Sequence, residues 1–197
     1  MKSQREFSWS SSSNARPAPP SGFRYHPDFV SEAEETDLVA GLRALPLAEI
    51  RMRGVVARRR TAHFGWTYGY ETWRIEPGPP IPDFLTALRA RAGGLIGVAA
   101  GALAEVLVTE YTPGAGIGWH RDAPMFGVVV GVSLLGACRF RFRRGRAGER
   151  GTPEATLEPR SVYVLDGEAR AGWQHSIPPA KGLRYSVTFR TLRERPP

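Results

Sequence analysis

The order of apolar and polar residues predicts two helices in the first half of the chain. A capping-box pattern, Ser31-Glu32-Ala33-Glu34, is followed by apolar residues at helical spacing up to Pro46. Phe84–Ala92 has similar spacing, and we expect Phe84, Leu85 and Leu88 to be its buried residues.

From Glu105 onward the apolar residues come in short runs separated by Gly- and Pro-rich turns, which is typical of strands. We expect strands at Glu105–Tyr111, Gly127–Leu135, Cys138–Arg143, Ala155–Glu158, Ser161–Leu165 and Arg184–Thr191. This order predicts a mainly β fold with flanking α-helices. We expect a double-stranded β-helix (jelly roll) with the two N-terminal helices packed on one sheet.

Length and composition favour one domain preceded by a tail. Residues 1–22 are polar and rich in Ser and Pro, which predicts a disordered polar tail before a domain at residues 23–197. The single cysteine, Cys138, excludes a disulfide framework, fits a reducing cytoplasm and is expected to be a small core residue. No apolar run of about 18 residues is present, so we expect no membrane span. We also expect a cytoplasmic monomer.

The net charge of +8 comes almost entirely from arginine, since Lys2 and Lys181 are the only lysines. A basic balance favours a polyanionic partner such as nucleic acid. A GC-rich genome would also enrich arginine, so composition alone leaves both explanations open.

His120, Asp122 and His175 form a candidate metal site. Asp122 lies two residues after His120, a spacing that puts both side chains on one face of a strand. Two histidines and a carboxylate can hold one face of iron(II) and leave the other face open to oxygen and a co-substrate. Zinc accepts the same residue types.

Two arginines near the C-terminus extend this chemistry. Arg184 and Arg190 are six residues apart in RYSVTFR, so in an extended strand they share a face with Ser186 and Thr188. An arginine can grip an organic acid through two parallel hydrogen bonds. Zinc leaves this arginine pair unexplained, whereas an oxygen-using iron enzyme fed by a keto acid accounts for it.

Four segments carry a family resemblance: VTEYTPGAGIGWHRD, GVSLLGACRFRF, LEPRSVYVLDGEARAGWQHSIPP and LRYSVTFR. They resemble the AlkB family of iron(II)/2-oxoglutarate dioxygenases, over about Phe23 to Arg193. The resemblance implies that Fe(II) is bound by His120, Asp122 and His175, and that 2-oxoglutarate and O2 are co-substrates. It also implies that Tyr111 hydrogen-bonds 2-oxoglutarate, that Arg184 pairs with its distal carboxylate, and that Arg190 lies near its metal end.

The chain departs from the family pattern at three places. Thr109 and Ser186 stand where many members have Asn; both can still donate a hydrogen bond, and we expect them at the co-substrate. Ala123 and Pro124 follow the metal motif, where the best-known members carry an acid that contacts the target base. This last departure leaves the choice of base open.

The resemblance also implies a nucleotide-recognition lid at about residues 51–76. Arginines precede four aromatics that alternate with other residues and would form one face of a strand. We expect bases or phosphates to be contacted by Phe64, Trp66, Tyr68, Tyr70, Arg59 and Arg60. The alternative is a half-buried hairpin whose aromatics pack on the sheet and whose arginines are solvated.

A second basic strip consists of Arg139, Arg141 and Arg143, which alternate with Phe140 and Phe142. We expect the phenylalanines to face the core. The arginines would face outward, where they either contact phosphates or are solvated.

The resemblance implies oxidative dealkylation of damaged nucleobases in an alkylated nucleic acid. The leading substrates are 1-methyladenine, 3-methylcytosine or etheno adducts in DNA, with RNA as a further substrate. The target base would have to leave its stack. Two alternatives remain: a 2-oxoglutarate oxygenase acting on RNA, a protein or a small molecule, and a nucleic-acid-binding module with a vestigial metal site.

Overall fold

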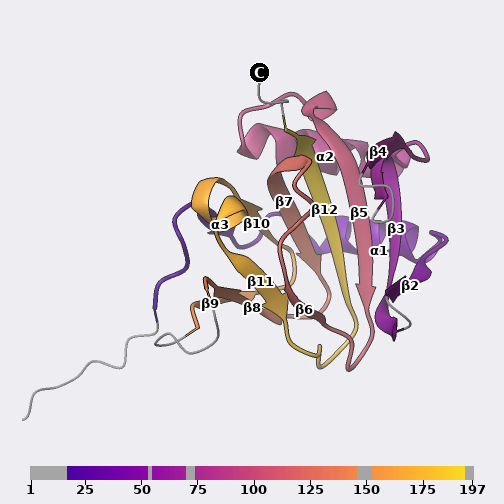
Figure 1. Ribbon diagram of the computed structural model, residues 1–197. Coiled ribbons are helices and arrows are strands. Elements are labelled where there is room, and N and C mark those ends of the chain that lie inside the picture. The colour runs from indigo at the N-terminus through magenta and orange to yellow at the C-terminus, as the bar shows by residue number, and fades with distance from the viewer. Residues whose placement is uncertain (1–16, 53–54, 70–73, 146–151, 194–197) are drawn as a thin grey trace, which may run out of the picture.

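Two β-sheets form the body of the protein in the computed structural model, which describes residues 17–52, 55–69, 74–145 and 152–193 (Figure 1). In the larger sheet, seven described strands run in the order β1-β10-β7-β12-β5-β3-β2, and β4 pairs with β3. The described strands of the smaller sheet run in the order β6-β11-β8-β9. The predicted jelly roll is confirmed.

The strands of the larger sheet are β1 (Phe23–His26), β2 (Ala48–Met52), β3 (Val55–Gly69), β4 (Arg74–Pro77), β5 (Leu103–Tyr111), β7 (Phe126–Leu134), β10 (Ser161–Leu165) and β12 (Arg184–Leu192). Those of the smaller sheet are β6 (Ile117–His120), β8 (Cys138–Arg143), β9 (Glu154–Leu157) and β11 (Gln174–Ile177). The helices are α1 (Glu32–Arg43), η1 (Asp83–Leu85), α2 (Thr86–Leu95), η2 (Ala100–Ala102) and α3 (Gly167–Ala171). All six strands predicted from the sequence are present, with their ends shifted by at most two residues.

Helices α1 and α2 cover one face of the larger sheet, as predicted. The capping box forms, since Ser31 accepts from the Glu34 backbone and the Glu34 side chain accepts from the Ser31 backbone. Leu42 of α1 and Leu88 of α2 join one apolar cluster with Val106 and Val108 of β5. This cluster holds the helices on the sheet, because burying each such side chain contributes about 1.5–3 kcal/mol.

The prediction that Phe84 is buried is wrong. The chain enters the second helix through the tighter turn η1, which places Leu85 in the core and leaves Phe84 38% exposed. The Phe84 ring lies instead over Gly41 of α1, where a Cβ atom would come within 2.8 Å of it.

A second apolar cluster lies between the two sheets. The alternation predicted for β8 is confirmed, because Phe140 and Phe142 are buried in this cluster, and so is Cys138. Tyr163 of β10 packs on Phe140 from the larger sheet, with ring centroids 4.9 Å apart.

Strand β3 separates from β5 after Gly65, the last residue that pairs with β5. Gly65 has φ +77°, and a Cβ atom there would lie 2.2 Å from the Ala104 carbonyl oxygen, so a side chain does not fit. Beyond this residue β3 pairs with β4, with Trp66 opposite Pro77. The lid predicted at residues 51–76 falls largely on β3 and β4, and its residues 53–54 and 70–73 lie outside the described part.

The predicted tail falls mostly on residues 1–16, which lie outside the described part of the chain. Its last residues belong to the folded body, because the carbonyls of Ser21 and Gly22 accept hydrogen bonds from Ala169 and Asp166. No helix in the described ranges has the length and apolar character needed to cross a bilayer.

Candidate active site

A cavity of about 390 Å³ lies between the sheets. Strands β3, β5 and β12 contribute one side of it, and residues of the smaller sheet and of the segment after β6 contribute the other. The side chains that line it from β5 and β12 are Glu105, Leu107, Thr109, Tyr111, Ser186, Thr188 and Arg190.

The three predicted metal-binding residues meet in this cavity. His120 and His175 are directly paired across β6 and β11, and their ring centroids are 4.3 Å apart. Asp122 follows β6, and its Oδ2 atom lies 3.6 Å from Nε2 of His175. Residues far apart in the sequence are thus brought together by the pairing of β6 with β11.

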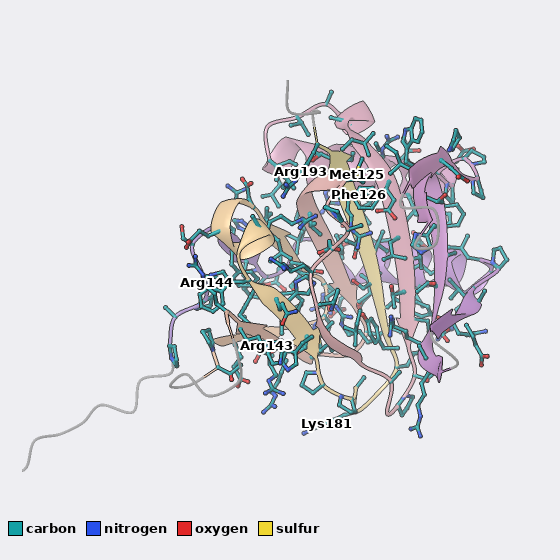
Figure 2. The ribbon with its side chains drawn as sticks, in the orientation of Figure 1. Met125, Phe126, Arg143, Arg144, Lys181 and Arg193 are labelled. Atoms are coloured by element: carbon teal, nitrogen blue, oxygen red, sulfur yellow. The ribbon has the colours of Figure 1, made fainter. Side chains whose placement is uncertain are left out.

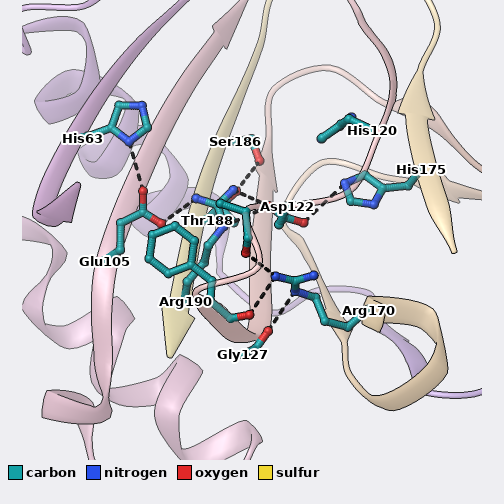
Figure 3. A network of polar contacts seen from close by, with 12 residues as sticks. His63, Glu105, His120, Asp122, Gly127, Arg170, His175, Ser186, Thr188 and Arg190 are labelled. Atoms are coloured by element: carbon teal, nitrogen blue, oxygen red, sulfur yellow. Dashed lines mark hydrogen bonds and ion pairs between the residues drawn. The ribbon is translucent and has the colours of Figure 1, made fainter. Parts of the chain in front are cut away.

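Arg190 fixes the carboxylate of Asp122 (Figure 3). Its Nε and Nη2 atoms both donate to Oδ1, at 2.9 and 2.6 Å. The other oxygen, Oδ2, is buried and has no hydrogen-bond partner in the described structure. Burial alone would raise the pKa of Asp122, but Arg190 and the two histidines outweigh burial and hold that pKa well below its usual range.

Both histidines are held in the neutral form that binds metals. Burial lowers the pKa of His175 to about 3, and it also lowers the pKa of His120. Nδ1 of His120 lies 2.9 Å from the Gly118 carbonyl oxygen, so this nitrogen carries the proton and Nε2 keeps its lone pair.

These features fit an iron(II) ion. Two neutral imidazoles, together with a carboxylate whose Oδ2 atom is buried without a hydrogen-bond partner, form a donor set that suits a divalent cation. Among the residues that the structure describes, no three His, Cys, Asp or Glu side chains are arranged as a complete metal-coordination site. The separation of 3.6 Å between Asp122 Oδ2 and His175 Nε2 nevertheless lets both atoms reach one ion at about 2.1 Å.

Arg184 is a buried cation with an open fork. It is fully buried, and its Nε donates to Ser133 Oγ at 2.9 Å, but neither Nη1 nor Nη2 has a partner in the described structure. Its guanidinium carbon lies 5.0 Å from the centre of the Tyr111 ring, which lines the cavity. A buried guanidinium with two unsatisfied nitrogens is stabilised when it binds a carboxylate through two parallel hydrogen bonds. The fork therefore fits the distal end of a keto diacid.

Three further predicted co-substrate residues line the cavity, whereas Arg184 itself is not among its lining residues. Thr109 and Ser186 are direct partners across β5 and β12, and both line the cavity together with Tyr111. Burial raises the pKa of Tyr111, so its hydroxyl stays protonated and able to donate. The assignment of Thr109, Ser186 and Tyr111 to 2-oxoglutarate stays a prediction, with a geometry that allows it.

A chain of charges connects the metal-binding residues to the wall of the cavity (Figure 3). Arg190 Nη1 donates to Glu105 Oε2 at 2.6 Å, and Glu105 Oε1 lies 3.0 Å from His63 Nδ1. Burial works to raise the pKa of Glu105, but Arg190 and His63 lower it overall, so Glu105 stays ionised.

Arg170 of α3 anchors the segment that carries Asp122 (Figure 3). Its guanidinium is buried and donates to the backbone carbonyls of Ala123, Phe126 and Gly127, at 2.7, 2.7 and 2.9 Å. These bonds fix the turn between β6 and β7.

The structure separates the six predicted substrate residues. Arg59 lines the cavity, a position that allows substrate contact, and its assignment to the substrate stays a prediction. Phe64 does not line the cavity. It is 7% exposed and belongs to the apolar cluster that holds α1 and α2 on the sheet, as does Val106, its partner on β5. Arg60 lies away from the cavity and forms a two-pronged pair with buried Glu110, at 2.9 and 3.0 Å.

Trp66 is 36% exposed and lines a different hollow, near η2 and β12. The prediction that Phe64 contacts the substrate is therefore wrong, because this ring is buried in the core. Arg60 and Trp66 do not line the cavity but are exposed, and their contact with the substrate stays a prediction. The side chain of Tyr68 and all of Tyr70 lie outside the described part. The cavity is lined instead by the other alternate positions of β3: Arg59, Thr61, His63 and Thr67.

Sequence reasoning missed Glu105 and Arg170. Glu105 could have been found, because it lies at intervals of two before Thr109 and Tyr111 on the same predicted strand. Arg170 carried no such pattern, since its role depends on three backbone carbonyls distant in the sequence.

Comparisons with known proteins agree with this geometry. Residues 22–190 match the family model described as the 2OG-Fe(II) oxygenase superfamily. The "Alkylated DNA repair protein ALKBH8 homolog" of Arabidopsis thaliana is 29% identical over 86% of this chain and 58% of its own length. The "Probable RNA/DNA demethylase ALKBH6" of Danio rerio is 31% identical over 61% of this chain and 48% of its own. The "tRNA (carboxymethyluridine(34)-5-O)-methyltransferase ALKBH8" of Mus musculus is 27% identical over 70% of this chain and 25% of its own.

The chain thus spans between a quarter and about three fifths of these relatives. Among solved structures, OsALKBH1 superposes with a TM-score of 0.68 at 15% identity, over 90% of this chain and 100% of that one. A prolyl-4-hydroxylase of Pseudomonas putida gives a TM-score of 0.60 at 15% identity, over 87% and 93%. Both likenesses concern the fold. The chain belongs to the 2OG-Fe(II) oxygenase superfamily and, within it, to the AlkB family.

Proposed function

We propose that this oxygenase removes alkyl groups from nucleobases in DNA, with His120, Asp122 and His175 holding iron(II) and Arg184 holding 2-oxoglutarate. The observation that carries the proposal is the wall of the cavity across from the two metal-binding histidines. Polar side chains of β3 line it, among them Arg59, Thr61 and His63. Such a wall can hydrogen-bond the edges of a single base that has left its stack.

Charge supports a nucleic-acid substrate. The chain carries a net charge of +8, and Arg59 at the cavity adds a cation where a phosphate would approach. The names of two relatives, an alkylated DNA repair protein homolog and a probable RNA/DNA demethylase, point in the same direction.

Each residue of the active site has a separate role in the proposed reaction. Bound iron(II) with 2-oxoglutarate and oxygen would supply the oxidant. Arg190 turns Oδ2 of Asp122 toward the histidines, Arg184 orients the keto acid, and Arg170 keeps the turn after Asp122 in place. His63, held by Glu105, offers its other ring nitrogen to the base.

A modified base in RNA is the second candidate substrate. A cationic methylated base favours a free carboxylate nearby, yet Glu105 and Asp122 are both bound to Arg190 and the residue after Asp122 is Ala123. The relative named as a tRNA methyltransferase also favours RNA.

A panel of short DNA and RNA strands separates these candidates. Each strand carries one modified base: 1-methyladenine, 3-methylcytosine, an etheno adduct or a modified uridine. After incubation with iron(II) and 2-oxoglutarate, mass spectrometry identifies the base that changed, and Asp122→Ala is the control. We expect dealkylation of a DNA strand. Oxidation of RNA alone favours the second candidate, and 2-oxoglutarate turnover that no strand stimulates would contradict both.

A further inference from the structure

The outer face of the smaller sheet carries arginines that the proposed chemistry leaves unused. Arg139, Arg141 and Arg143 alternate along β8 with phenylalanines of the core, so they point outward (Figure 2, where Arg143 is labelled). Trp119 of β6 shares this face, because its neighbour His120 lines the cavity.

Trp119 is the platform on which two of these arginines stack. The guanidinium carbons of Arg141 and Arg143 lie 5.2 and 4.6 Å from the centre of its rings. A guanidinium that stacks through its flat face keeps its N–H edge available to an anion. We call Trp119, Arg141 and Arg143 the Trp119 platform.

Among the described residues, no carboxylate neutralises the charge of the platform. Within the described residues no carboxylate forms an ion pair with Arg141 or Arg143, and Arg143 donates only its Nε, to Gln174 Oε1 at 2.7 Å. Two like charges on one indole repel each other, and an anion bridging them would remove that repulsion. Phosphate is a matching anion, since it accepts forked hydrogen bonds from arginine.

The platform is continuous with the active-site cavity. Arg59 lines the cavity and donates from Nη1 to the Gly116 carbonyl oxygen at 3.5 Å. Gly116 in turn lines, with Trp119 and Arg141, a shallow hollow of about 340 Å³ on the outer face. Strand β6 is an edge strand of the described sheet, so within that sheet no further strand separates the two hollows.

We propose that the Trp119 platform binds the phosphate backbone of the same nucleic-acid strand whose base enters the cavity. The strand would leave the cavity beside Arg59, cross Gly116 at the sheet edge, and place its flanking phosphates on Arg141 and Arg143. This inference rests on the proposed function for its substrate. It adds a second contact surface, on the reverse side of the strands that carry His120 and His175.

Binding of unmodified single strands tests the platform without relying on catalysis. Fluorescence anisotropy measures the affinity for labelled strands of about 4 and about 12 nucleotides, lengths that bracket a typical single-strand site. The variant is Arg141→Gln with Arg143→Gln. The matched control is Arg24→Gln with Arg43→Gln, two exposed arginines on β1 and α1 that lose the same charge.

We expect the variant to bind the longer strand roughly tenfold more weakly than the control pair does, with the salt slope reduced by about 1.4 for two lost phosphate contacts. The affinity for the shorter strand should change by less than about twofold. Trp119→Leu keeps both charges and should show a smaller loss for the longer strand.

Equal affinity of variant and control for the longer strand would overturn the platform, and so would a wild-type protein that binds no strand. Competition by polyglutamate as strong as by the unlabelled strand would assign the surface to acidic proteins instead. Length-dependent binding without any oxidation of modified bases would leave the platform standing and reject only the proposed chemistry.

Discussion

Arg190 and Asp122 share a hydrogen-bonded contact in which two nitrogens of the guanidinium approach a single carboxylate oxygen, at 2.9 and 2.6 Å. The second oxygen of Asp122 is buried and unpartnered, and it lies on the side of His175. Arg190 is therefore a positioning residue: it selects which oxygen of Asp122 is available to a metal.

Replacing Arg190 with Gln should weaken metal binding. Without the guanidinium Asp122 can rotate, and losing a partner of this kind typically costs 10–100-fold in metal affinity. Titration of the apoprotein with Fe(II) or Co(II) measures the change. Arg193→Gln is the control, since the Arg193 side chain, within the described residues, donates only to the Phe126 carbonyl. Unchanged metal affinity in Arg190→Gln would show that Asp122 needs no such support.

Arg184→Met should abolish stabilisation of the protein by 2-oxoglutarate. At about 100 times its dissociation constant a ligand adds about 2.7 kcal/mol to the unfolding free energy of the wild type. The variant should gain nothing at that concentration, because the fork that holds the distal carboxylate is gone. Thermal unfolding with and without 2-oxoglutarate, in the presence of Mn(II), measures both proteins.

The same variant tests how the buried cation affects the apoprotein. Its own unfolding free energy should stay within about 1 kcal/mol of the wild type, since an unpaired buried charge contributes no stability and only the Ser133 hydrogen bond is lost. Equal stabilisation of both proteins by 2-oxoglutarate would mean that another residue holds the acid.

Arg59→Gln and Arg60→Gln should behave differently although the residues are neighbours. Arg59 lines the cavity, whereas Arg60 pairs with Glu110 on the opposite face of β3. Arg59→Gln should lower the affinity for a modified strand about threefold to tenfold and flatten its salt dependence. Arg60→Gln should lower the unfolding free energy by about 1 kcal/mol and leave strand affinity unchanged. Equal loss of strand affinity in both variants would contradict this orientation of β3.

Phe64→Ala should act on stability alone. Phe64 is buried under the helices, so removing its ring should cost about 3–5 kcal/mol of unfolding free energy. Urea denaturation measures this loss, and at low temperature the folded fraction should keep its strand affinity. A normal stability with reduced strand affinity would return Phe64 to the substrate side.

The strands and the shared direction of His120 and Asp122 could be predicted because their information is local. Alternation along β8 and β12 and the spacing of His120 and Asp122 can each be read within a few residues. Which face of β3 points into the cavity could not be predicted, because both faces carry residue types that could contact a substrate. Aromatics occupy one face and polar residues the other, and only pairing with β5 decides which faces the cavity.

The contacts of Arg170 depend on a different kind of information. Its three acceptors are backbone carbonyls about 45 residues away, and a carbonyl leaves no mark in the sequence. Glu105 is an intermediate case. Its alternation with Thr109 and Tyr111 is visible in the sequence, but the pairing with Arg190 that allows its carboxylate to be buried is not.

The most direct test of the account counts succinate against altered bases. The wild-type protein with iron(II), 2-oxoglutarate and an alkylated strand should form about one succinate for each base restored, as expected when one keto acid is consumed per oxidation. Asp122→Ala should form neither product while keeping its fold, because the donor set has lost a ligand. Restored bases from Asp122→Ala, or restoration by the wild type without iron, would contradict the account.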